Sequence, residues 1–95
     1  MDFETKINER VEVLAVYRTG VDVSQIAYPA KMKWRHEEIM FARLNLRHPT
    51  AQGKRMIHVF DVSDGVNDYR LEFDAEGLTW TLVAIVEGSR VRPQH

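Results

Sequence analysis

The residues of this chain that could form a metal or proton-transfer site gather around one segment. His58 lies three residues before Asp61 and six before Asp64. On a β-strand, positions 58 and 61 point to opposite faces, whereas metal ligands must converge on one point. We therefore expect no metal site here, and we interpret His58 as a side chain that lines one face of a strand.

The segment from Asp61 to Asp68 has the composition of a calcium-binding loop, because several oxygen-bearing side chains surround Gly65. An EF-hand loop carries its glycine at the sixth position, but Gly65 is fifth when the count starts at Asp61. Asp, Asn and Gly are also the residues that tight turns require. The sequence therefore predicts a hairpin turn in this segment.

No pattern in the chain favours nucleophilic or cofactor chemistry. Ser24, Ser63 and Ser89 lie in predicted connections, outside any nucleophile-elbow motif, and no glycine-rich phosphate loop is present. The chain has no cysteine, which excludes disulfides, thiolate metal ligands and cysteine nucleophiles. We expect a protein that is not an enzyme and that uses neither a cofactor nor a metal.

The basic and acidic residues are separated along the chain, although the net charge is only -1. Residues 31–58 contain seven Lys and Arg against two Glu, whereas residues 59–88 contain seven Asp and Glu against one Arg. A basic surface of this kind could bind a single-stranded nucleic acid. The candidate contacts are Lys31, Lys33, Arg35, Arg47, Lys54 and Arg55. The alternative is that these cations pair with acids on neighbouring strands, and a pI near 6.4 is lower than a dedicated nucleic-acid domain would have.

The elements that must position these side chains are short alternating segments, which are typical of β-strands. The first predicted strand covers residues 11–18. Phe3, Ile7, Val11 and Leu14 also recur at helical spacing after Asp2, so a short helix over residues 2–9 could precede this strand. Residues 47–54, which hold a proline and a glycine, are interpreted as an exposed loop. The five further predicted strands cover residues 29–34, 39–46, 55–62, 69–74 and 78–86.

Six strands joined mostly by short turns predict a mainly β fold, an antiparallel meander in a curled sheet or small barrel. The 95 residues are enough for one hydrophobic core. We expect a single domain over residues 1–88 and a disordered tail over residues 89–95. No stretch approaches the roughly 18 apolar residues of a membrane span, so we expect a cytoplasmic protein without a membrane partner.

Three groups of residues carry a resemblance to known sequences. Pro29, Met32 and Trp34 form the first, the pattern from Tyr69 through Leu71 to Phe73 and Asp74 forms the second, and Trp80 with Leu82 forms the third. Together they resemble a class of small uncharacterised bacterial domains with the plan Pro-x-x-x-x-Trp, Tyr-x-Leu and Trp-x-Leu, over roughly residues 28–86. The resemblance implies a small all-β fold and supplies no activity and no functional residue.

These observations favour a small non-catalytic binding or interaction module. It would form homo-oligomers or dock a protein through an open sheet edge or one end of the barrel. Tyr17, Tyr28 and Tyr69 are candidate surface anchors for a protein contact. Single-stranded nucleic-acid binding is the alternative, and a barrel that encloses a small apolar ligand is a third class. In the third class, six short strands and two tryptophans would be expected to fill the interior.

Overall fold

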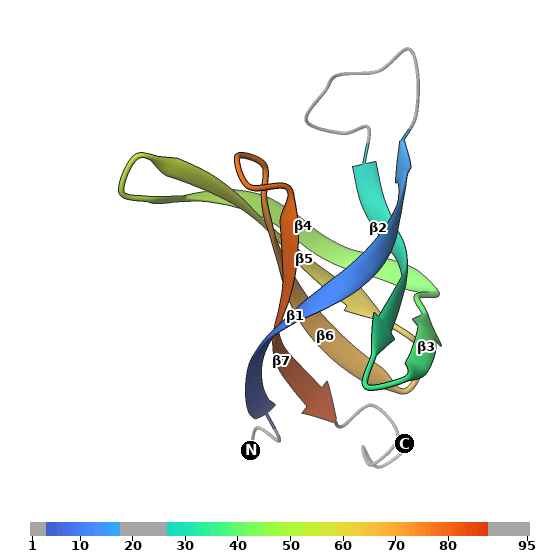
Figure 1. Cartoon of the computed structure of the whole chain (residues 1–95). Helices are drawn as coiled ribbons and strands as arrows, with labels where there is room; N and C mark the ends of the chain where they lie inside the picture. Colours follow the sequence, from blue (N-terminus) through green and yellow to red (C-terminus); the bar gives the residue numbers. More distant parts are fainter. Residues whose placement is uncertain (1–3, 18–26, 88–95) are drawn as a thin grey trace.

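Seven antiparallel β-strands and no helix make up the computed structural model, which describes residues 4–17 and 27–87 (Figure 1). None of these residues therefore belongs to a helix long and apolar enough to cross a membrane. The strands are β1 (Glu4–Tyr17), β2 (Ala27–Trp34), β3 (Glu37–Met40), β4 (Arg43–Gln52), β5 (Arg55–Ser63), β6 (Asn67–Asp74) and β7 (Thr79–Glu87).

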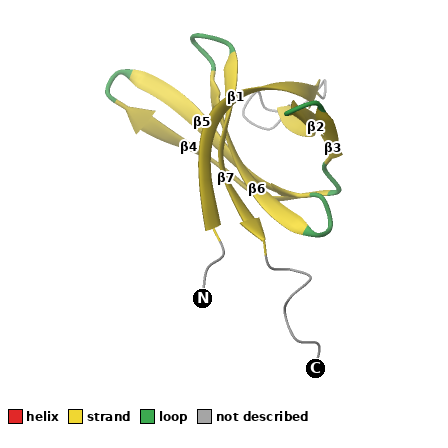
Figure 2. Cartoon of the chain, turned by 60° about the horizontal axis from the view of Figure 1, so that its bottom comes forward, coloured by secondary structure: helices red, strands yellow, loops and turns green. Residues whose placement is uncertain are grey.

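The strands form one sheet in the order β3-β2-β1-β7-β6-β5-β4, and this sheet curls around a common interior (Figure 2). Residues 4–11 of β1 pair with β7, and residues 12–17 pair with β2. The two edge strands, β3 and β4, are consecutive in sequence and meet at a corner. There, Phe41 N–H donates to the Ala30 carbonyl at 2.9 Å and Ala42 N–H to the Ser63 carbonyl at 2.7 Å. The antiparallel meander in a curled sheet was predicted from the sequence and is confirmed.

The core lies on the concave face, where alternate residues of β5, β6 and β7 meet Met32 of β2. The buried residues in contact are Met32, Phe60, Val62, Tyr69, Leu71, Leu82 and Ile85. Trp80 stacks at a tilt between two phenylalanines, with ring centroids 5.4 Å from Phe60 and 4.7 Å from Phe73. Trp34 packs on the edge of the same cluster. Met32 and Trp34, at alternate positions of the strand predicted over residues 29–34, therefore both face the interior.

A β-bulge at Val83 changes which residues of β7 face the core. Leu71 pairs with Leu82, but the next residue along, Arg70, pairs with Ala84, so Val83 has no single partner. Such an extra residue shifts the alternation of side chains by one position. Ile85, and not Ala84, consequently continues the inner row begun by Leu82, which simple alternation through residue 86 did not predict.

The expected helix over residues 2–9 is wrong wherever the structure describes it, because Glu4 already begins β1. The helical spacing arose from residues that belong to two environments. Ile7 and Val11 pack against the core at alternate positions of a strand, whereas Leu14 points to solvent. Two consecutive residues, Ile7 and Asn8, sit opposite Val83, and the polar Glu9 pairs with Leu82 at the next inward position, so the apolar alternation of the strand is interrupted there.

The expected loop over residues 47–54 is also wrong, because residues 47–52 continue β4 and only Gly53 and Lys54 form the turn. Pro49 suggested a loop since proline cannot donate a ladder hydrogen bond. At a sheet edge the missing N–H can point away from the neighbouring strand, and proline is tolerated there. The predicted strand over residues 39–46 is divided at Phe41 and Ala42, where the chain turns the corner.

Two leucines of β7 and the turn before it provide a matched test of this core. Leu82 is fully buried, whereas Leu78 is 74% exposed. We expect Leu82→Ala to lower the free energy of unfolding by about 2–5 kcal/mol and Leu78→Ala to lower it by less than about 0.5 kcal/mol. Urea denaturation followed by tryptophan fluorescence would measure both, and equal losses would contradict the inward placement of Leu82.

Candidate functional site

The β4–β5 hairpin is a basic structure that extends beyond the rest of the sheet, toward the upper left of Figure 1. No acidic residue occurs between positions 39 and 60, which include β4, the turn and most of β5. The basic and titratable side chains of this hairpin are Arg43, Arg47, His48, Lys54, Arg55 and His58. A surface with this charge attracts anionic partners.

The same hairpin exposes aliphatic side chains. Leu46 is 51% exposed, and Leu44 and Met56 are exposed to a similar degree. A bulge at Asn45 places Leu44 opposite Val62 and Leu46 opposite Asp61, so the two leucines lie on different faces of the strand. The hairpin therefore exposes aliphatic side chains on both of its faces, beside its positive charge.

The six cations predicted as nucleic-acid contacts lie in two separate places. Lys31, Lys33 and Arg35 lie on β2 and the β2–β3 turn, on the right side of Figure 1, whereas the other three lie on the hairpin. Several already have carboxylate partners. Lys31 contacts Glu38 at 3.4 Å and Arg35 contacts Glu9 at 2.5 Å. These pairs leave less positive charge on β2 than the sequence suggests.

Arg55 is also held by acids, at the base of the β6–β7 turn. It forms ion pairs with Asp74 and, at 3.3 Å, with Glu76. Arg43, in contrast, donates to neutral oxygens, Asn45 Oδ1 at 3.0 Å and Ser63 Oγ at 3.5 Å. Neither Arg43 nor Lys54 forms an ion pair with another described residue. The positive charge of the hairpin therefore comes from β4 and the turn more than from Arg55.

The three tyrosines differ in their surroundings. Tyr69 is only 5% exposed and its ring lies 5.6 Å from that of Phe41, so it contributes to the core and offers little surface to a partner. Tyr28 is half-buried in β2. The side chain of Tyr17 lies outside the described part of the structure.

A cluster that the sequence did not reveal joins β1 to the β2–β3 turn. Glu9 pairs with Leu82 and so faces the interior, where its Oε1 accepts a hydrogen bond from Trp34 Nε1 at 2.8 Å. The Arg35 guanidinium lies 4.6 Å from the centre of the Trp34 ring and donates to Glu9. The Arg35 and Trp34 hydrogen bonds lower the pKa of Glu9. The expected N-terminal helix hid this cluster, because only a strand aims Glu9 inward.

Asp64 organises the β5–β6 turn that the sequence predicted. Its Oδ1 accepts hydrogen bonds from the Val66 and Asn67 amides, both at 2.8 Å, and its Oδ2 accepts one from the Tyr69 hydroxyl at 2.8 Å. Burial alone would raise the pKa of Asp64, but these hydrogen bonds outweigh it and the pKa falls below its ordinary value. Burial and the Asp64 carboxylate raise the pKa of Tyr69 to about 12. Asp64 thus serves the turn.

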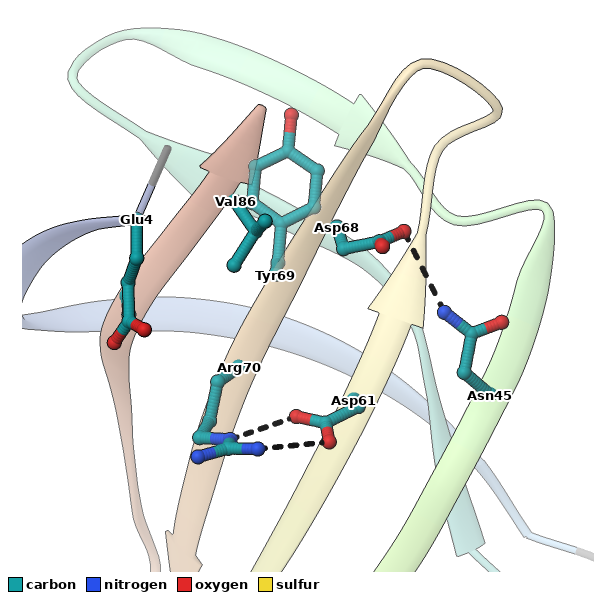
Figure 3. A pocket seen from close by; sticks show the side chains of 8 residues that line it. Glu4, Asn45, Asp61, Asp68, Tyr69, Arg70 and Val86 are labelled. Atoms are coloured by element: carbon teal, nitrogen blue, oxygen red, sulfur yellow. Dashed lines mark hydrogen bonds and ion pairs between the residues drawn. The ribbon is translucent and has the colours of Figure 1, made fainter. Parts of the chain in front are cut away.

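A hollow of about 230 Å³ lies where β1, β7, β6 and β5 run side by side (Figure 3). Three of its charged groups have hydrogen-bond partners within the hollow. Arg70 donates to both oxygens of Asp61, at 2.8 and 3.1 Å, and Asn45 Nδ2 donates to Asp68 at 3.5 Å. Over residues 4–17 and 27–87, no three His, Asp or Glu side chains gather as a metal site requires. Asp61 pairs with Arg70 and His58 with Phe73 on the opposite face.

No family model, no curated protein and no solved structure matches this chain. The chemistry of the chain's own surface must therefore carry the functional argument, and the β4–β5 hairpin is the surface where positive charge and exposed aliphatic groups coincide.

The contact between Tyr69 and Asp64 predicts a specific dependence of stability on pH. Above pH 10, tyrosines of the unfolded chain ionise, while Tyr69 of the folded chain keeps its proton until about pH 12. The contribution of protonated Tyr69 to stability is complete below pH 10 and is lost as the pH rises from 10 to about 12. Between pH 10 and 12, we expect the free energy of unfolding of Tyr69→Phe to fall by about 1–2 kcal/mol less than that of the wild type. Urea denaturation at pH 8, 10, 11 and 12 would measure this, and parallel curves would contradict it.

The β2–β3 turn stores backbone strain. Arg35 and His36 both have positive φ, 52° and 70°, which costs a non-glycine residue about 1–2 kcal/mol. Glycine avoids this strain, but it lowers the free energy of unfolding by about 0.5–1 kcal/mol because its backbone is more flexible in the unfolded chain. We therefore expect His36→Gly to raise the free energy of unfolding by about 0.5–1 kcal/mol.

Thermal denaturation would measure the effect of His36→Gly. Glu37→Gly is the matched control, because Glu37 lies in β3 and has no positive φ. That control should destabilise the protein. A loss of stability in both variants would show that the turn is not strained at His36.

Proposed function

We propose that this domain is a non-catalytic protein-interaction module that binds its partner along the β4–β5 hairpin. One observation carries the proposal. A ten-residue strand, β4, lies at the edge of the sheet within a hairpin that has no acidic residue before Asp61, near the end of β5, and that exposes Leu44, Leu46 and Met56. An edge strand with exposed aliphatic groups can pair with another chain.

The aromatic residues favour a protein partner over a single-stranded nucleic acid. Proteins that bind single strands stack the bases on exposed aromatic rings. Here the rings of Phe60, Phe73 and Trp80 stack on one another, and the hairpin exposes leucine and methionine instead. Three of the six candidate phosphate contacts, Lys31, Arg35 and Arg55, also have carboxylate partners.

Site-specific photo-crosslinking would test the proposal, with a benzophenone amino acid in place of Leu46 and, as a control, in place of Leu78. Both leucines are exposed, but only Leu46 lies on the hairpin. In the cells that make the protein, we expect Leu46 to give a protein adduct that protease removes and nuclease does not. We expect Leu78 to give at most one tenth as much.

Each other outcome of the crosslinking has a definite meaning. A nuclease-sensitive adduct at Leu46 would replace the proposal with nucleic-acid binding. Equal adducts at Leu46 and Leu78, or none at Leu46, would show that the hairpin is not an interaction surface. An adduct of twice the chain's mass would keep the proposal and identify the partner as a second copy of this chain.

A further inference from the structure

We propose that the partner is an acidic segment in an extended conformation, which adds to the sheet as a new strand beside β4. This inference rests on the proposed function, because it names the chemistry of the partner that the hairpin binds. Three features of β4 support it: the direction of its backbone groups, the charge along it, and the position of Pro49.

The backbone of β4 presents hydrogen-bonding groups on the side away from β5. A two-residue turn closes the hairpin, and Gln52 pairs with Arg55 across it. The two residues that flank such a turn exchange backbone hydrogen bonds with each other. Along the hairpin, hydrogen-bonded residue pairs then alternate with pairs whose N–H and C=O groups point outward, away from the partner strand. The pairs Ala51–Met56 and Pro49–His58 are therefore of the outward-pointing kind. Since no other strand lies beyond β4 in the described sheet, an incoming strand can pair there.

The charge of the hairpin selects an acidic strand. Opposite charges on adjacent strands stabilise a pair, and like charges directly across from each other destabilise it. Arg43 and Lys54 lie on β4 and the turn, with no acid from residue 39 to residue 60. A second β4 from another copy would bring these cations against one another, so charge disfavours pairing of β4 with itself. An extended segment that alternates acidic and aliphatic residues complements both the cations and the exposed leucines.

Pro49 limits how long the added strand can be. Its nitrogen points toward the open edge, as the alternation requires, and carries no hydrogen to donate. The incoming strand can accept from the Ala51 amide and donate to the Pro49 and Ala51 carbonyls, but it misses one hydrogen bond at the centre of β4. Substitution at these two positions therefore changes binding without removing a hydrogen bond to β5.

Titration of the isotope-labelled full chain with acetyl-(Glu-Val)4-amide would test the inference, with acetyl-(Lys-Val)4-amide as the control peptide. We expect the glutamate peptide to shift the amide resonances of β4, to slow hydrogen exchange at Ala51, and to bind more weakly as salt rises. We expect the lysine peptide to bind at least tenfold more weakly. Equal binding of both peptides, or shifts confined to other strands, would overturn the acidic strand.

Two variants make the test independent of charge. Pro49→Ala supplies the missing donor, so we expect it to bind the glutamate peptide roughly two- to tenfold more tightly, the effect of one backbone hydrogen bond. Ala51→Pro removes a donor on the same edge and should weaken binding by a similar factor. Unchanged amide spectra of β5 and β6 would show that both variants fold. Equal affinity of the two variants would overturn strand addition.

The two experiments separate the failure of this inference from the failure of the proposed function. A protein adduct at Leu46 together with no binding of the glutamate peptide would keep the hairpin as the docking site and reject the acidic strand. No adduct at Leu46 would reject the docking site itself, whatever the peptide binds.

Discussion

Two backbone hydrogen bonds fix the corner between the edge strands β3 and β4. The Phe41 amide donates to β2, and the Ala42 amide donates to β5. The chain has enough large apolar side chains for one face of a sheet, and a flat sheet would leave that face in water. Because β3 and β4 are consecutive, the corner forces the sheet to curl, and the concave face closes over Met32, Leu71 and Leu82. The core, the edge strand and the projecting hairpin all follow from this curl.

The sequence predicted the parts of the fold that depend on local alternation. The strands around Phe60 and Leu71 alternate regularly, and the structure has them where they were expected. Alternation failed where the backbone is irregular. The polar Glu9 at an inward position of β1 interrupted the apolar alternation, so that strand resembled a helix. Pro49 made an edge strand resemble a loop, because an isolated sequence does not show which strand lies at the edge.

The charges of the candidate site were predictable in kind but not in availability. Counting residues located the basic middle of the chain, yet Arg55 and Lys31 turn out to be paired with acids. Those acids lie close only because their strands are neighbours in the sheet. Ion pairing therefore depends on strand order and register and not on composition. Glu9 shows the same limit, since its contacts with Trp34 and Arg35 connect positions 25 and 26 residues apart.

The pairing of β1 with β7 has a consequence for folding during synthesis. Glu4 lies opposite Val86. The N-terminal half of β1, the first strand of the sheet to be synthesised, therefore cannot pair until β7, the last one, is available. Contacts between such distant positions form slowly, because a long loop must close before they contribute stability. On the ribosome, the emerging chain can gather β2 to β6, but its interior stays open to water until β7 has left the exit tunnel. The domain therefore completes its fold only after β7 has emerged, and until then its apolar strands depend on dilution or chaperones to remain apart.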